Sequence, residues 1–257
     1  MTTIQGGTVT FVFTDIAGST ELLKQLGDRY ADALADHRRI VRDAFRSRGG
    51  EEVDTQGDAF FYCFGRAKDA VAAAVAAQQA LASHDWPDGS ELRVRMSVHT
   101  GEPVVGEEGY VGIDVHRAAR ICSAGHGGQV LLSATTAALV SGALPDGVRQ
   151  VELGPVRLKD IDEPERVVQL EIEGLPASFP PLRTEKEEPM DFGERLSRKI
   201  HAQVERQVEL ALSGDPSQVD VRGTTKLAML GFIPLVMVLL FVAFAVLVGV
   251  LLVKLIA

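Results

Sequence analysis

The sequence is short of positive charge and of cysteine. It has 26 Lys and Arg against 35 Asp and Glu, which gives a formal net charge of −9. Surfaces that bind nucleic acid are basic, so this balance argues against DNA or RNA as a partner. The two cysteines, Cys63 and Cys122, lie in apolar surroundings, and no Cys/His cluster accompanies them. A zinc site or a disulfide framework is therefore not expected, and both residues are predicted to be reduced thiols in a core.

The two ends of the chain differ sharply. The first residues, MTTIQGGT, have neither a basic nor an apolar stretch, so no signal peptide is expected there. Residues 227–253 are uncharged and almost wholly apolar. At about 1.5 Å per residue, a helix of that length exceeds the roughly 30 Å hydrocarbon core of a bilayer. The run predicts a transmembrane helix, with a buried core helix as the alternative. Arg222, Lys226 and Lys254 flank it and favour a cytoplasmic N-terminal domain, tail-anchored in the cell (plasma) membrane.

Three segments connect this run to the rest of the chain. Residues 176–189 are rich in proline and charge, and are interpreted as a linker after a domain of residues 1–175. Residues 190–213 have apolar side chains at helical spacing. They predict an amphipathic helix that pairs with its copy, docks on the protein or lies on the bilayer surface. Residues 214–226 are a second polar linker.

Hydrophobic periodicity divides residues 1–175 into strands and helices. Strands are predicted over 8–15, 51–54, 58–64, 92–100, 129–133, 148–153 and 167–172, and helices over 18–49, 67–83, 112–124 and 134–140. The initial order β-α-β-β-α-β is that of a ferredoxin-like α+β fold, an antiparallel sheet covered by helices. In such a unit the third strand lies antiparallel between the first two.

Two aspartates stand where this topology brings strand ends together. Asp15 ends the first strand and Asp58 begins the third, so both carboxylates are expected at one edge of the sheet. Like charges that close repel unless a cation lies between them, and Mg²⁺ or Mn²⁺ suits such oxygen ligands. The alternatives are an N-cap role for Asp15 and a turn role for Asp58. Residues 18–20 open a helix whose exposed N–H groups favour phosphate, which suggests two-metal phosphoryl chemistry.

Four sequence blocks carry a resemblance to a known family. They are FVFTDIAGST, VDTQGDAFFYCF, VRMSVHTGEP and YVGIDVHRAARICSAGHGGQVLLS. In this order and spacing they resemble the catalytic domain of class III adenylyl and guanylyl cyclases of the actinobacterial type, over roughly residues 6–172. The resemblance implies conversion of ATP or GTP to a 3′,5′-cyclic nucleotide and pyrophosphate. It also implies a head-to-tail homodimer with sites between the subunits, and two Mg²⁺ or Mn²⁺ ions per site.

The resemblance assigns roles residue by residue. Asp15 and Asp58 match the two metal-binding aspartates, and the backbone carbonyl of Ile16 matches a further metal ligand. Arg120 matches the arginine of the partner subunit that stabilises the transition state, where a guanidinium spreads charge over phosphoryl oxygens. The positions matched to triphosphate binding are Ala17, Gly18, Ser19, Thr20, Arg95 and Lys159.

The residues at the positions that recognise the nucleotide base and the transition state depart from the adenylyl cyclase pattern. Asp54 stands where those enzymes have a lysine, Gly109 where they have an aspartate, and His116 where they have the transition-state asparagine. A carboxylate only accepts hydrogen bonds, and guanine offers the donors N1–H and N2–H₂, so Asp54 favours GTP as the substrate. Adenine N6 is also a donor, so ATP stays open as the alternative. Asp54 is alternatively a solvated strand-end acid. His116 either replaces the asparagine as a hydrogen-bond donor or packs at the dimer interface.

Two functions therefore remain open. The first is an active, membrane-anchored cyclase in cyclic-nucleotide signalling. The second is a catalytically silent module that binds nucleotide or a partner protein, or completes a heterodimer with another cyclase subunit. The intact acids and arginines favour catalysis, because unpaired buried acids are costly. His99 and His126 are interpreted as structural, and Asp114 as either a base contact or an exposed helix residue.

Overall fold

The computed structural model of the chain describes residues 7–106 and 109–183. The predicted helix over 190–213, the linker over 214–226 and the apolar run over 227–253 lie outside these residues. Within the described part, no helix is long and apolar enough to cross a membrane.

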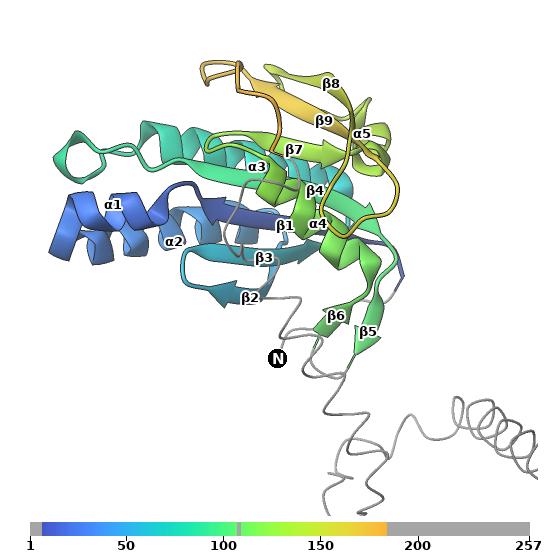
Figure 1. The fold of residues 1–257 in the computed structure, drawn as a ribbon, viewed down its shortest axis with the longest axis horizontal. Helices are drawn as coiled ribbons and strands as arrows, with labels where there is room; N and C mark the ends of the chain where they lie inside the picture. Colours follow the sequence, from blue (N-terminus) through green and yellow to red (C-terminus); the bar gives the residue numbers. More distant parts are fainter. Residues whose placement is uncertain (1–6, 107–108, 184–257) are drawn as a thin grey trace, which may run out of the picture. The chain divides into compact units, whose positions relative to one another are not determined.

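A seven-stranded sheet lies at the centre of the described chain, in the order β2-β3-β1-β4-β7-β9-β8 (Figure 1). The strands are β1 (Val9–Ile16), β2 (Glu51–Gln56), β3 (Ala59–Phe64), β4 (Val94–Gly101), β7 (Val130–Ser133), β8 (Val148–Val156) and β9 (Glu165–Ile172). The half β2-β3-β1-β4 is the predicted ferredoxin-like arrangement, with β3 antiparallel between β1 and β2. The sheet is antiparallel, as predicted, at every strand pair but one: β4 and β7 pair in parallel. A helical crossover between these two strands allows that pairing.

Helices cover both faces of the sheet. They are α1 (Ser19–Leu26), α2 (Tyr30–Arg46), α3 (Ala67–Ser83), α4 (Ile113–Ala124) and α5 (Ala134–Val140). Side chains alternate along a strand, so β1 contributes to two cores. Val12 packs in the cluster that includes α2, α3 and α5, whereas Phe11 and Phe13 pack in the cluster that includes α4. The strand that carries Asp15 is therefore packed on both faces.

The segment predicted as one helix over 18–49 is divided, and that prediction was wrong. A short 3-10 helix, η1 (Gly27–Arg29), separates α1 from α2. Gly27 has φ 54° and ψ −124°, a backbone conformation that residues with a side chain rarely adopt. α1 ends before this residue, and α2 begins only after η1.

A short hairpin was not predicted at all. It consists of β5 (Val104–Gly106) and β6 (Gly109–Val111), which pair in antiparallel fashion outside the main sheet (Figure 1). Val104 and Val105 expose 65% and 44% of their surface. Three residues per strand are too few to show a period in the sequence.

The chain stays packed on the domain after β9. Residues 174–183, here called the strap, follow that strand. Leu182 packs against the apolar cluster around α4 and β7, and the Arg183 N–H donates to the Ala124 carbonyl at 3.0 Å. The first half of the linker expected over 176–189 is therefore part of the packed domain.

Candidate active site

The structure brings Asp15 and Asp58 to the same edge of the sheet. β1 and β3 are antiparallel with Thr14 opposite Phe60, so Asp15 follows one residue of that pair and Asp58 precedes the other by two positions. The charges of both acids affect the pKa of the Tyr30 phenol. Burial raises its pKa first, and the charges of Asp58 and Asp15 raise it further while Arg38 lowers it. Tyr30, to which the sequence assigns no role, therefore lies within electrostatic range of both carboxylates.

The donor set fits a divalent cation. The Oδ2 atom of Asp58 is buried and has no hydrogen-bond partner in the described part of the chain, which is costly for a carboxylate. No group of three or more His, Cys, Asp or Glu suited to a metal occurs among the described residues. Two carboxylates completed by substrate phosphates are what Mg²⁺ commonly uses. Ile16, the predicted carbonyl ligand, is the last residue of β1 and is buried.

Arg95 forms an ion pair with Asp15. It lies on β4 directly opposite that residue. Its Nε and Nη2 atoms donate to Oδ2 of Asp15 at 3.0 and 2.6 Å, and Nη1 donates to the Ser123 carbonyl at 3.0 Å. Both side chains are largely buried, with 8% and 13% of their surface exposed. The predicted triphosphate contact of Arg95 thus competes with a buried ion pair.

The predicted phosphate loop connects β1 to α1. Ser19 and Thr20 are the first residues of α1, where helix geometry leaves N–H groups without an intrahelical acceptor. Gly18 precedes them in a left-handed conformation, with φ 69°. The Ala17 N–H donates to the Arg93 carbonyl at 2.9 Å, so this N–H is already used within the chain. The anion-binding capacity of the loop therefore lies in its helical part.

Arg120 and His116 lie one turn apart on α4 and so share a face of that helix. The Arg120 guanidinium donates from Nη2 to Oδ2 of Asp160 at 2.5 Å. Asp160 and Lys159 are neighbours in the loop between β8 and β9. The structure therefore brings Lys159 towards Arg120, and it adds Asp160, which had no role in the sequence-based prediction.

Comparison with known proteins decides the family. Residues 2–171 match the model of the adenylate and guanylate cyclase catalytic domain. This chain belongs to that cyclase family. The matched residues include both acids, both arginines and Lys159, so the candidate site falls wholly within the cyclase domain.

Relatives of the cyclase domain agree with this assignment. An uncharacterised protein of Mycobacterium tuberculosis is 38% identical over 185 residues, which is 71% of this chain and 62% of that protein. The match thus spans less than two thirds of the relative. A structure of Trypanosoma brucei adenylate cyclases in their monomeric state has a TM-score of 0.64 at 29% identity, over 70% of this chain and 96% of that one. The guanylate cyclase domain from Catenaria anguillulae, solved in complex with GTP, shares the fold with a TM-score of 0.57 at 20% identity, over 64% and 96%.

The two positions that the resemblance assigns to base recognition, Asp54 and Gly109, lie near each other. A Cβ atom on Gly109 would be 4.0 Å from Cγ1 of Val53, the neighbour of Asp54. Gly109 has φ 136°, which disfavours any side chain there. The Asp54 carboxylate accepts from the Thr55 N–H at 2.9 Å and from Nε2 of Gln56 at 3.0 Å. These two hydrogen bonds hold the Asp54 side chain against its own strand, β2. The residue is also half-buried, so it is not a freely solvated acid.

Asp114 belongs to a buried network. Its Oδ1 bonds Nε2 of His99 at 3.2 Å and Nη1 of Arg117 at 2.6 Å, and its Oδ2 accepts from the Glu102 N–H at 3.0 Å. The hydrogen bond to His99 is the first cause that lowers the pKa of Asp114. Nδ1 of His99 bonds the Ser133 hydroxyl at 2.8 Å. The structural role expected for His99 is confirmed, and an exposed Asp114 was wrong.

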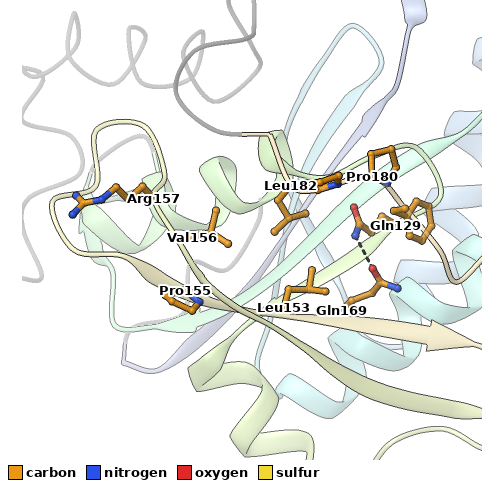
Figure 2. A pocket seen from close by; sticks show the side chains of 10 residues that line it. Gln129, Leu153, Pro155, Val156, Arg157, Gln169, Pro180 and Leu182 are labelled. Atoms are coloured by element: carbon orange, nitrogen blue, oxygen red, sulfur yellow. Dashed lines mark hydrogen bonds between the residues drawn. The ribbon is translucent and has the colours of Figure 1, made fainter.

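Two hollows adjoin the strap. The one in Figure 2 has a volume of about 830 Å³, and Gln129 and Gln169 line it, bonded to each other at 2.7 Å. Their amides also bond the His126 N–H at 3.0 Å and the Ala177 carbonyl at 2.7 Å. The second hollow, of about 560 Å³, is lined in part by Ala17 and His126. The strap therefore lies next to the loop that follows Asp15.

Proposed function

We propose that this chain is a class III purine nucleotide cyclase that converts ATP or GTP to a 3′,5′-cyclic nucleotide and pyrophosphate. The convergence of Asp15 and Asp58 at one sheet edge, with an unpartnered buried oxygen on Asp58, is the observation that carries the proposal. The ribose 3′-hydroxyl gives its proton to solvent and its oxygen attacks the α-phosphorus, the bond from that phosphorus to the bridging oxygen breaks, and pyrophosphate leaves. Two Mg²⁺ or Mn²⁺ ions, when bound, lower the pKa of the 3′-hydroxyl and neutralise phosphate charge.

The side chains of the domain divide the remaining work. Asp15 and Asp58 hold the ions. The first N–H groups of α1, with Lys159, bind the triphosphate. Arg120, contributed by the second chain of a homodimer, stabilises charge that develops on the phosphoryl oxygens. His116, on the same face of α4, donates a hydrogen bond to the nucleotide.

A second candidate is a subunit that needs a different cyclase chain to complete its base site. The state of Asp54 and Gly109 favours it. The carboxylate of Asp54 is bonded along its own strand, and Gly109 has no side chain to read a base. A partner with base-reading side chains would restore activity that the homodimer lacks.

We further propose that residues 227–253 anchor the protein in the plasma membrane with the cyclase domain in the cytoplasm. The uncharged apolar run and the flanking Arg222 and Lys226 support this orientation. The full chain should sediment with membranes and resist extraction by carbonate. A chain without residues 227–257 should stay in the supernatant; equal partition of both chains would contradict the anchor.

The decisive experiment uses the full chain in detergent with Mn²⁺ and either ATP or GTP. Cyclic product and pyrophosphate should form in equal amounts. Asp58→Asn should lower kcat by about a hundredfold or more, because a metal ligand is lost. The same substitution should leave the unfolding temperature measured without metal unchanged or raise it, since it removes the negative charge from a half-buried carboxyl group whose buried Oδ2 has no hydrogen-bond partner among the described residues.

Asp162→Asn, on the exposed part of the loop between β8 and β9, is the matched control and should keep wild-type activity. Equal activity of Asp58→Asn and wild type would overturn the proposed site. If the wild type forms no product with either nucleotide, the homodimer is inactive and the second candidate gains support. The preferred nucleotide shows what Asp54 reads.

A further inference from the structure

The loop between β8 and β9 contains a tight turn that is fixed against α4. Leu158 is 4% exposed and packs in one cluster with Ile121 of α4. The Ile161 N–H donates to the Leu158 carbonyl at 3.3 Å, which closes a four-residue turn. Lys159 and Asp160 are the two central residues of this turn. Their position relative to α4 is therefore set by packing and not by the rest of the loop.

Asp160 occupies the third position of the turn with φ 58°. Residues with a side chain seldom adopt a positive φ, although Asp and Asn tolerate it better than most. Backbone strain of this kind tends to persist at functional positions. In this case the strained residue is also the one that meets the Arg120 guanidinium.

The two side chains of the ion pair between Arg120 and Asp160 differ greatly in their exposure to solvent. The Arg120 side chain is 8% exposed, whereas the Asp160 side chain is 64% exposed. A charge so nearly buried requires a counter-charge, and the nearby carboxylate at 2.5 Å provides it. The guanidinium has five N–H donors in one plane, so an acid held at Nη2 leaves other donors for a substrate and fixes the plane in which they lie.

We propose that Asp160 is a positioning residue for Arg120. It holds one edge of the guanidinium so that the other N–H groups meet the phosphoryl oxygens during cyclisation. The inference rests on the proposed function. Because Lys159 and Asp160 share one turn, the same four residues set both the lysine contact to the triphosphate and the orientation of Arg120.

Asp160→Asn in the full chain tests this directly. The variant keeps the shape of the side chain and tolerates the left-handed backbone, but it loses the charge. We expect kcat to fall by about ten- to a hundredfold, with KM for the metal–nucleotide complex within about twofold of wild type. Asp160→Gly, which relieves the strained backbone, should show the same fall, because the carboxylate is missing there as well. Asp162→Asn, as before, should leave both constants unchanged.

The comparison with Arg120→Gln separates positioning from a general structural role. If Asp160 acts through Arg120, adding Asp160→Asn to Arg120→Gln causes no further fall in kcat. An equal fall in both backgrounds, or a kcat for Asp160→Asn within about twofold of wild type, would overturn the inference while the cyclase function stands.

A wild-type chain without product would instead overturn the active homodimer and favour the second candidate function. The urea midpoints of the two single variants and the double variant then decide the inference. Non-additive shifts support Asp160 as the residue that fixes Arg120, and additive shifts overturn it.

Discussion

His37, on α2, is completely buried, and neither ring nitrogen has a hydrogen-bond partner among the described residues. Its ring lies 5.7 Å from that of Phe60. Burial, and then the charges of Arg38 and Arg42, lower the pKa of His37 to about 3. The folded chain thus keeps this imidazole neutral in mildly acidic solution, in which the unfolded chain protonates it.

Acid should therefore destabilise the protein through His37. Its contribution to the free energy of unfolding is fully present above about pH 6.5 and is lost as the pH falls towards about 3. Between these limits the loss is about 1.4 kcal/mol per pH unit. Carboxylates with a lowered pKa, such as Glu52, also lose stability in the more acidic part of this range, so the test is the difference between wild type and His37→Leu. Between about pH 6.5 and 5, urea unfolding of the wild type should lose about 1.4 kcal/mol per pH unit more than that of His37→Leu. His126→Gln, at a partly exposed position, should behave as the wild type does, and equal slopes in wild type and His37→Leu would contradict the prediction.

Among the elements, the junction of α1 and α2 depends on the backbone of Gly27. Gly27→Ala should lower the free energy of unfolding by about 1–3 kcal/mol, because the new side chain opposes the local φ and ψ. Gly142 has no positive φ, and no atom lies within 4 Å of a Cβ placed there. Gly142→Ala should therefore be neutral or slightly stabilising. Equal effects in urea unfolding would show that the junction imposes no strain.

The strap should also contribute measurably to stability. Leu182→Ala removes a half-buried side chain from the cluster around α4 and β7 and should cost about 1–2 kcal/mol. Leu139 on α5 is 59% exposed, so Leu139→Ala should change the free energy of unfolding by less than about 0.5 kcal/mol. Thermal unfolding of both variants makes the comparison. A neutral Leu182→Ala would mean that the strap is not held by its apolar contacts.

The local sequence pattern was sufficient to predict the bounds of some helices and strands but not of others. The helices α3 and α5 have the predicted bounds, and neither segment contains a glycine or proline that would interrupt it. β8 extends to Val156 through Pro155, although proline usually ends a strand; β8 is an edge strand, where proline is tolerated. The break at Gly27 and the short hairpin depend on backbone conformation that periodicity does not report.

In the candidate site, too, some features could be predicted from the sequence and others could not. Topology alone places Asp15 beside Asp58, so the acid pair was predictable from strand order. The partners of the two arginines were not. Arg95 meets Asp15 across 80 positions of sequence, and Arg120 meets Asp160 across 40. Sequence spacing carries no signal for such pairs, which arise only when strands and loops are assembled.

For the whole molecule, a site between two chains predicts complementation. Asp58→Asn and Arg120→Gln homodimers should each be inactive, because every site lacks one essential group. In an equal mixture, half of the dimers are mixed, and each has one complete site and one that lacks both groups. Co-expressed variants should thus regain about a quarter of wild-type cyclic-nucleotide production. The same variants combined in one chain provide the control, and no recovery in the mixture would place the site within a single chain.

The ion pair between Arg95 and Asp15 bears on the stability of the protein in a cell when divalent cations are scarce. The buried acid has a positive charge from its own chain, so the fold does not depend on a metal ion to neutralise it. Under the proposed function, a cell short of divalent cations would lose the activity, whereas Asp15 would stay paired with Arg95 and would not destabilise the fold. The output of the protein would follow metal supply reversibly, and recovery would need no new synthesis.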